Sequence, residues 1–485
     1  MIASEPSRTV QVTLADDPSD VIEVVGTRAN QSFKIDRRTY RVQQTPHSAQ
    51  KDAVQLMRGL PAVSLTPDDQ IMLLGSGNAK VFVDGRPYSG NSREYLRTLH
   101  GSDIERIEII TNPSAQYLSE GTAGIVNFVL RKKTGDGATG NASVEASSYR
   151  RILADSTIKY KHGRGTYELQ GGGNVGALSR STYHKRRSVE AVLVGPATVN
   201  TEDGGRVYEG TVGRLSAKVS YDVDPKTTVS AKLGGGGGHD NFTTDAAFRG
   251  LTSNFASFSE HQRLDSVADY FTGDFTLDHK GTKEGETINT AAQFYWSPKF
   301  RDITDTHASN ASNFSFAQLN RSFTGHSQID WTHPLRKDRI LTLGGSWDIT
   351  EKEQQYRFSS LGSDGSLGAN TQDQYNARTS TIAGYATFQQ PVGRWAVVPG
   401  LRIEQSSRHI ASPRLPDVAT LRTNVFPTLH VKHTFKKQFD LTLSYSKRID
   451  RVPLEYLRPY SAVEDVVTIF HGNPSRRILT LGALF

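Results

Sequence analysis

Three stretches of the sequence have residue types and spacing that could support chemistry. Residues 171–176 read Gly-Gly-Gly-Asn-Val-Gly, the spacing of a dinucleotide-binding loop, but residues 178–187 are polar and loop-like where that site needs a helix. The five glycines at 234–238 lack the Gly-Lys-Ser/Thr of a phosphate-binding loop, so we interpret them as a flexible loop. His430 and His433 are three positions apart on an expected strand, which points the two rings to opposite faces and argues against a metal pair.

Acid catalysis is the remaining chemical interpretation, and it rests on Asp84, Glu105 and Glu108. No other residues converge with these three to form a site. We therefore interpret Asp84 as a turn residue, and Glu105 and Glu108 as solvated strand positions. The sequence contains neither a G-x-S-x-G nucleophile elbow nor an H-E-x-x-H zinc motif. We therefore expect no catalytic residue, no cofactor and no metal site, and hence no enzyme.

Composition leaves two structural classes open. Hydrophobic residues make up 36% of the 485, mean hydropathy is −0.48, and no run approaches the roughly 18 apolar residues of a membrane helix. A soluble protein and a transmembrane β-barrel both give this profile. The absence of cysteine excludes disulfides and thiolate metal sites. The net charge of +7 comes with no nucleic-acid recognition motif, so nucleic acid is not an expected partner.

From Gly140 onward, apolar and polar residues alternate with a period of two. Leu441, Leu443 and Tyr445, for example, are separated by Thr442 and Ser444. The apolar face of such a strand meets either the core of a sandwich or the lipid around a barrel. Pro399 interrupts an otherwise regular strand, and we expect it at a bulge or on an unpaired edge.

Connection lengths favour the barrel. Short turns alternate with long polar segments at roughly 178–205, 237–262, 298–318, 353–375 and 447–475. Short periplasmic turns and long external loops are typical of outer-membrane barrels, whereas structureless segments of this length are rare in compact soluble domains. Aromatic residues near the expected strand ends suit interfacial girdles: Tyr149, Tyr160, Tyr167, Tyr221 and Trp331.

The first part of the chain has a different pattern, typical of a small mixed α/β domain. Residues 48–60 predict an amphipathic helix that Gly59 and Pro61 end. Strands are expected at 71–74, 81–83 and 125–130, and a second helix at 92–100. A further strand is expected around Ile107 and Ile109, where Asn112-Pro113 stops the β-branched run. Asp84-Gly85 is a hairpin-type turn.

The stretch 104–133 resembles the end of the plug domain of TonB-dependent outer-membrane receptors. The resemblance is carried by an ordered set of residues: Gly59, Pro61, Asp84, Gly85, Glu105, Arg106, Glu108, Pro113, Gly121, Gly124 and Asn127. Residues 400–404, 443–449 and 472–474 are similar to barrel signatures of the same receptors. The resemblance covers most of the chain from about residue 20 to 474.

This resemblance implies an N-terminal extension at 1–45, a plug domain at 46–135 and an antiparallel transmembrane β-barrel at 136–485. We expect about 13 or 14 strands where such receptors have about 22, so the barrel is predicted to be incomplete. Residues 475–485 leave the family pattern, although Leu479, Leu481, Ala483 and Phe485 alternate like a last strand.

A short β-prone segment precedes the expected plug: Val21, Ile22, Glu23, Val24 and Val25. In these receptors such a segment is the TonB box, which adds as a strand to the energising protein of the inner membrane. An ordinary first strand is the alternative interpretation of the same residues.

The function implied by the resemblance is active uptake of a scarce nutrient across the bacterial outer membrane. Siderophores are the usual cargo of the family, so the expected partners are a TonB-type protein, outer-membrane lipid and a small iron-chelate ligand. No signal peptide is visible at Met1. A receptor that senses without transport, and a soluble secreted β-domain that binds polysaccharide, are the alternatives. The sequence does not choose the ligand.

Overall fold

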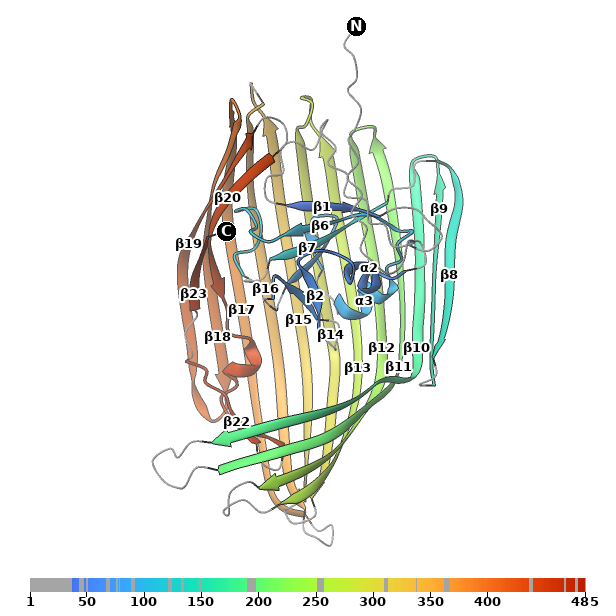
Figure 1. Cartoon of the computed structure of the whole chain (residues 1–485), viewed down its shortest axis with the longest axis vertical. Coiled ribbons are helices and arrows are strands. Elements are labelled where there is room, and N and C mark those ends of the chain that lie inside the picture. The colour runs from blue at the N-terminus through green and yellow to red at the C-terminus, as the bar shows by residue number, and fades with distance from the viewer. Residues whose placement is uncertain are drawn as a thin grey trace.

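The computed structural model describes two main bodies of β-structure, one enclosed by the other (Figure 1). The structure describes residues 37–484, except residues 43–47, 49–50, 67–69, 76, 78, 89–91, 121–123, 132–134, 148–149, 190–197, 251–256, 309–312, 337, 362–366, 436–438, 466–467 and 476–478. The TonB-box-like residues 21–25 and Gly121 therefore lie outside the described part. No helix in that part is long and apolar enough to cross a membrane.

The smaller body is built around a five-stranded sheet in the order β1-β6-β7-β4-β5. Its β4–β7 pair is parallel and the others are antiparallel. The strands are β1 (Arg38–Arg41), β4 (Lys80–Val83), β5 (Arg86–Pro87), β6 (Ile104–Ile110) and β7 (Ile125–Leu130); β2 (Val63–Leu65) and β3 (Ile71–Leu73) form a separate pair.

Among the described residues, two short helices cover this sheet, α2 (Ala53–Met57) and α3 (Ser92–Thr98). The predicted helix at 48–60 is too long: Asp52 caps α2 by accepting a hydrogen bond from the backbone N–H of Gln55, at 2.6 Å, which fixes the start of α2 at Ala53. Met57, Leu96 and Phe128 lie in one buried core with residues of β1, β3, β4 and β6. The expected mixed α/β packing is thus present, with shorter helices.

The larger body is an antiparallel sheet of 14 strands whose order follows the chain from β8 to β20 and then β23. This agrees with the predicted 13 or 14. The strands are β8 (Gly137–Ser147), β9 (Arg151–His162), β10 (Gly165–Val189), β11 (Thr198–Asp224), β12 (Thr227–Gly250), β13 (Phe258–Lys280), β14 (Thr287–Ala308), β15 (Asn313–Pro334), β16 (Ile340–Leu361), β17 (Leu367–Val392), β18 (Trp395–Ser412), β19 (Leu415–Phe435), β20 (Phe439–Asp450) and β23 (Leu479–Leu484).

The connection between β20 and β23 contains a 3₁₀ turn, η1 (Leu454–Leu457), and the small hairpin β21 (Ser461–Asp465) and β22 (Thr468–His471). The predicted boundaries at residues 46 and 136 stay a prediction. Strand β1 lies before residue 46 and pairs with β6, and the large sheet begins at Gly137.

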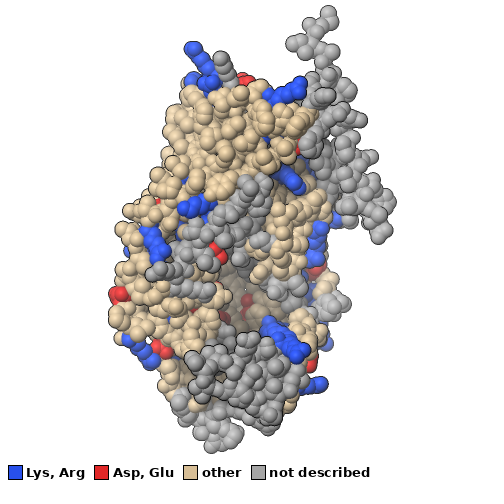
Figure 2. Space-filling view, turned by 60° about the vertical axis from the view of Figure 1, so that its left-hand side comes forward, with Lys and Arg blue, Asp and Glu red and all other residues tan. Residues whose placement is uncertain are grey.

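The two faces of the large sheet differ as the alternation predicts. Large apolar side chains stand exposed on its outer face, among them Ile158, Tyr160, Tyr167, Leu215, Tyr221, Phe275, Trp296, Leu343, Trp347, Ile382, Leu401, Ile403 and Leu443. Figure 2 shows few charged residues across the upper half of one side, with Lys and Arg at its top edge. Such an outer face suits lipid and is incompatible with a water-soluble β-domain.

The long polar segments are not loops, which corrects the prediction for 178–205, 237–262, 298–318 and 353–375. Most of these residues belong to paired strands: β10 and β11, for example, pair from Gly165–Tyr221 out to Val189–Thr198, with one shift of register between Ala177 and Ser179. Beyond the lipid both faces of a strand meet water, so apolar–polar alternation disappears although backbone pairing continues. Sequence patterning cannot distinguish such a hairpin from a polar loop.

The glycines at 234–238 are also part of a strand, β12, rather than the flexible loop we expected. A Cβ atom at Gly236 would lie 2.6 Å from the carbonyl oxygen of Gly213 and 2.8 Å from the Tyr270 hydroxyl. The missing side chain therefore admits a tyrosine ring on the neighbouring strand. Pro399 pairs with Leu429 of β19, while the β17–β18 pairing skips from Gly400 to Val397. This interruption is the irregularity predicted for a proline.

Candidate functional site

The plug-like motif residues form a buried hydrogen-bond network within the five-stranded sheet. Glu108 is 2% exposed. Its carboxylate accepts hydrogen bonds from Arg37 Nη1 at 2.8 Å, Asn127 Nδ2 at 2.9 Å and Arg106 Nε at 3.0 Å. Two guanidinium groups and an amide thus satisfy a carboxylate that would be costly to bury alone. Glu108 is therefore a structural residue, not the solvated strand position expected.

Asn127 and Asp84 connect this network to the turn at 84–85. Asn127 Oδ1 accepts a hydrogen bond from the Gly85 N–H at 2.8 Å, and Asp84 Oδ1 accepts one from the Leu130 N–H at 2.8 Å. Asp84 and Gly85 have φ angles of 50° and 81°, the left-handed values that an Asp-Gly turn predicts. The turn assignment is confirmed.

The other motif residues shape the chain around the sheet. Gly124 has φ 105°, and a Cβ atom there would lie 2.4 Å from the carbonyl oxygen of Ile110. Pro113 is buried, whereas Glu105 is exposed and paired with Arg106 at 2.8 Å. Gly59 and Pro61 lie just after α2. These residues support the fold, and none of them lines the pocket found on the large sheet.

Four charged residues join the small domain to the wall of the large sheet; we call them the Glu404 cluster. They are Glu120 of the small domain, Arg402 and Glu404 of β18, and Arg451 just after β20. Arg451 Nη2 lies 2.6 Å from Glu404 Oε2, and its Nη1 lies 3.4 Å from Glu120 Oε2. Arg402 Nε lies 2.6 Å from Glu404 Oε1. The side chains of Arg402 and Glu404 are 1% and 0% exposed.

Backbone contacts reinforce this junction. The Ile449 N–H donates to the Ser119 carbonyl at 3.1 Å, and Glu120 forms a parallel β-bridge with Ile449. The Asn112 side chain bonds Ser446. On the opposite wall, Asp103 pairs with Lys159 at 2.7 Å. The small domain is thus anchored by polar contacts, which a displacement can exchange for water more readily than an apolar core.

Sequence reasoning missed this cluster. One local signal was available: Arg402 and Glu404 alternate with Leu401 and Ile403, whose side chains are 45% and 46% exposed on the outer face. Charges that alternate with lipid-facing residues must point into the lumen. Nothing in the sequence places Arg451 or Glu120 beside them.

An aromatic and cationic group of side chains lies inside the large sheet further from the short turns; we call it the luminal aromatic cluster. Tyr460 stacks on Tyr356, with ring centroids 5.4 Å apart, and lies 6.0 Å from Tyr375. Arg458 lies 4.2 Å from the Phe470 ring centroid. The connection between β20 and β23 brings Tyr460, Arg458 and Phe470 to β16 and β17.

The turn η1 holds that connection against the wall. Leu457 is fully buried against Tyr375, Ala377 and Ile410, and the Tyr375 hydroxyl donates to the Leu454 carbonyl at 3.4 Å. Burial raises the pKa of Tyr460 well above its usual value, although the nearby Arg458 opposes this. The segment therefore covers part of the luminal wall with a neutral, aromatic surface next to a guanidinium. Among the described residues no group of three metal-ligating side chains forms a metal site.

Comparison with known proteins agrees with this architecture. Residues 279–475 match the outer membrane protein beta-barrel family. The chain is 21% identical over 452 residues to the ferric enterobactin receptor of Pseudomonas aeruginosa, covering 84% of this chain and 57% of that receptor. The chain therefore spans little more than half the length of this relative.

Two solved structures share the fold. The siderophore receptor PiuA from Acinetobacter baumannii has a TM-score of 0.54 at 11% identity, over 86% of this chain and 64% of that one. The copper transporter OprC has a TM-score of 0.56 at 11% identity, over 86% and 63%. The fold defines an outer-membrane β-barrel protein with a folded domain in its lumen. The family match and these relatives support a TonB-dependent receptor of the bacterial outer membrane.

Proposed function

We propose that this chain takes part in the energised uptake of an anionic, aromatic iron chelate of the catecholate type. The luminal aromatic cluster is the observation that carries the proposal. Tyr356, Tyr375 and Arg458 are buried beneath the connection between β20 and β23, so a ligand would reach them by displacing that connection. Tyrosine rings stack on a flat aromatic ligand, and arginine binds both its π-face and its negative charge. The relative from Pseudomonas aeruginosa that matches 84% of this chain is named a ferric enterobactin receptor, and this name supports the proposed ligand class.

Transport would use the Glu404 cluster. A ligand that displaces the segment 451–474 from the wall would pull on Arg451, which pairs with Glu404 of the barrel and Glu120 of the plug. A TonB-type protein acting on residues 21–25 would then shift a plug that polar contacts hold. The proposal includes no covalent step, so no catalytic residue is required.

The binding step can be tested on the purified chain in detergent. We expect radioactive iron supplied as a ferric catecholate to bind. Arg458→Gln should weaken binding by about 10- to 100-fold, because a hydrogen bond to a charged group contributes about 1.5–3 kcal/mol. The matched control is Arg249→Gln, which removes an exposed arginine from the distant strand β12.

Failure of the wild-type chain to bind any ferric catecholate would overturn the proposed ligand class. Equal affinity of the wild-type chain and Arg458→Gln would remove the luminal aromatic cluster from the site. Binding without energy-dependent accumulation in cells would identify a sensor rather than a transporter.

A further inference from the structure

Several exposed histidines in the described strands lie against aspartate side chains. One of them, His261 of β13, also has a second histidine as its cross-strand neighbour, because it pairs with His307 of β14 in the register of the large sheet. We call Asp245, His261 and His307 the histidine row. The other exposed histidines that contact an aspartate in the described strands have no histidine opposite them: His184, His239 and His409.

The histidine row crosses three adjacent strands on the outer face of the sheet. Asp245 of β12 pairs with His261, and His261 pairs with His307. Side chains directly opposite each other in an antiparallel pair stand on one face, with Cβ atoms about 4.5–5.5 Å apart. His261 has the same parity along β13 as Phe271 and Phe275, whose side chains are 48% and 44% exposed on the outer face. The three side chains of the row therefore point outward together.

The row lies beyond the apolar band of the sheet. Between Phe271 and His261 the outward positions of β13 include Asp269, Asp265 and Arg263, so charged residues replace apolar ones. The extended strand from residue 271 to residue 261 covers about 33 Å. The short turn at 281–286 lies at the other end of β13, so the row is on the side that faces the medium. Water rather than lipid surrounds it.

A hydrogen bond sets the state of the His261 ring. Nδ1 of His261 lies 2.7 Å from Asp245 Oδ1, and an ionised carboxylate can only accept. Nδ1 therefore donates, and Nε2 of the neutral ring keeps its lone pair for a metal ion. Metal-binding histidines commonly have this arrangement, in which the other ring nitrogen donates to a carboxylate. The His261 side chain is 51% exposed and His307 is exposed as well, so an ion can reach both rings from solvent.

We propose that His261 and His307 bind a divalent transition-metal ion, with Asp245 as a positioning residue that orients His261. Imidazole nitrogen suits Cu²⁺, Ni²⁺ and Zn²⁺, whereas Mg²⁺ and Ca²⁺ take oxygen ligands. Water would complete the coordination shell. A site with two protein ligands is compatible with the lack of a three-ligand group among the described residues. The ion would link β13 to β14 outside the membrane, and this inference is independent of the transported cargo.

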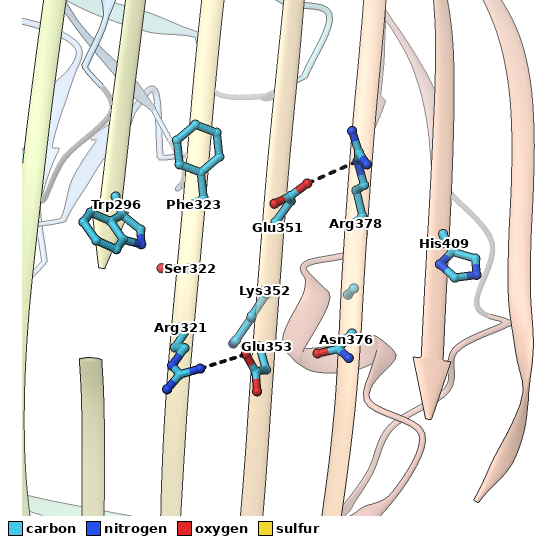
Figure 3. Close-up of a pocket in the computed structure, with 11 residues that line it drawn as sticks. Trp296, Arg321, Ser322, Phe323, Glu351, Lys352, Glu353, Asn376, Arg378 and His409 are labelled. Carbon is cyan, nitrogen blue, oxygen red and sulfur yellow. Dashed lines mark hydrogen bonds and ion pairs between the residues drawn. The ribbon is translucent and has the colours of Figure 1, made fainter. Parts of the chain in front are cut away.

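His409 of β18 provides the matched control. Its side chain is 54% exposed, and its Nε2 lies 3.2 Å from Asp417 Oδ2. Its cross-strand neighbour on β17 is Arg378, and Figure 3 shows both side chains on the outer face, with Arg378 paired to Glu351. A guanidinium has no acceptor atom and repels a cation. His409 therefore shares the exposure and the carboxylate of His261 but has no second imidazole opposite it.

The test uses the untagged whole chain in detergent with Cu²⁺ as the probe. Electron paramagnetic resonance, with less Cu²⁺ than protein, counts the nitrogen ligands at the strongest site, and calorimetry measures its affinity. We expect two imidazole nitrogens on the wild-type chain. Asp245→Ala should weaken binding by about tenfold and keep both nitrogens, because loss of a carboxylate behind a metal-binding histidine typically has an effect of about 10- to 100-fold. His307→Gln should weaken binding further and leave one nitrogen, whereas His409→Gln should bind like the wild-type chain.

Heat-modifiable migration of all four proteins verifies that they are folded. Absence of Cu²⁺ binding by the wild-type chain would overturn the proposal, and so would a wild-type spectrum with a single nitrogen. Equal affinity of His307→Gln and the wild-type chain, or an equal loss in His307→Gln and His409→Gln, would identify adventitious binding by surface histidines and would also overturn it.

Discussion

Substitution of Gly124 by alanine tests the tight approach between β6 and β7. A positive φ costs an L-residue about 1–2 kcal/mol, and here φ is 105°. The new Cβ would also lie 2.4 Å from the Ile110 carbonyl oxygen and 3.1 Å from Thr111 Cα, so backbone must move as well. We expect a total destabilisation of about 2–3 kcal/mol, confined at first to the plug.

Hydrogen exchange of the full chain in detergent measures this effect, because amide protection reports the free energy of local opening. Protection of peptides from β6 and β7 should fall by about 30- to 150-fold, while barrel peptides stay unchanged. Gly77→Ala is the matched control, since a Cβ there meets nothing within 4 Å. Unchanged protection in Gly124→Ala, or an equal fall in the control, would refute the argument from backbone conformation.

Two further predictions concern charged contacts. Glu404→Gln removes the carboxylate shared by Arg402 and Arg451 and should destabilise the plug–barrel junction by about 3–5 kcal/mol. The effect is measured as a lower urea concentration at which the plug becomes accessible to protease. The control Asp440→Asn breaks an exposed pair with Lys432 and should change that concentration little, so equal effects of the two substitutions would contradict the burial argument. The hydrogen bond from His333 lowers the pKa of Glu286 from 4.5 to about 2. The stabilisation that this contact gives to the β13–β14 turn should therefore be complete above pH 4.5 and be lost as the pH falls through about 2. An NMR titration of the Glu286 carboxyl group with a midpoint near 4.5 would disprove the contact.

Local chemistry made much of the fold predictable. Asp84-Gly85 specified its turn because few residue pairs accept two positive φ angles. Strand alternation gave the lipid-facing surface because a side chain's face depends only on its parity along the strand. The outer hairpins were missed because alternation ends where lipid ends. The start of α2 was misplaced because the capping contact of Asp52 competes with the amphipathic pattern.

The candidate sites were far less predictable. Arg451 connects Glu404 to Glu120. This relation depends on the pairing of β19 with both β18 and β20, and on the bridge between Glu120 and Ile449 of β20. Tyr356 and Tyr460 stack because the connection after β20 folds inward. Such contacts depend on long-range register, and no spacing along a single strand encodes them. Residues 21–25 remain a prediction from resemblance.

The central claim is energised uptake, and accumulation of radioactive iron tests it most directly. The measurement uses cells in which this protein is the only receptor for a ferric catecholate. We expect accumulation with the wild-type sequence. With Val24→Pro we expect surface binding without accumulation, because proline removes the backbone donor needed for strand addition. Equal accumulation by both proteins, or none by the wild-type protein, would contradict the account.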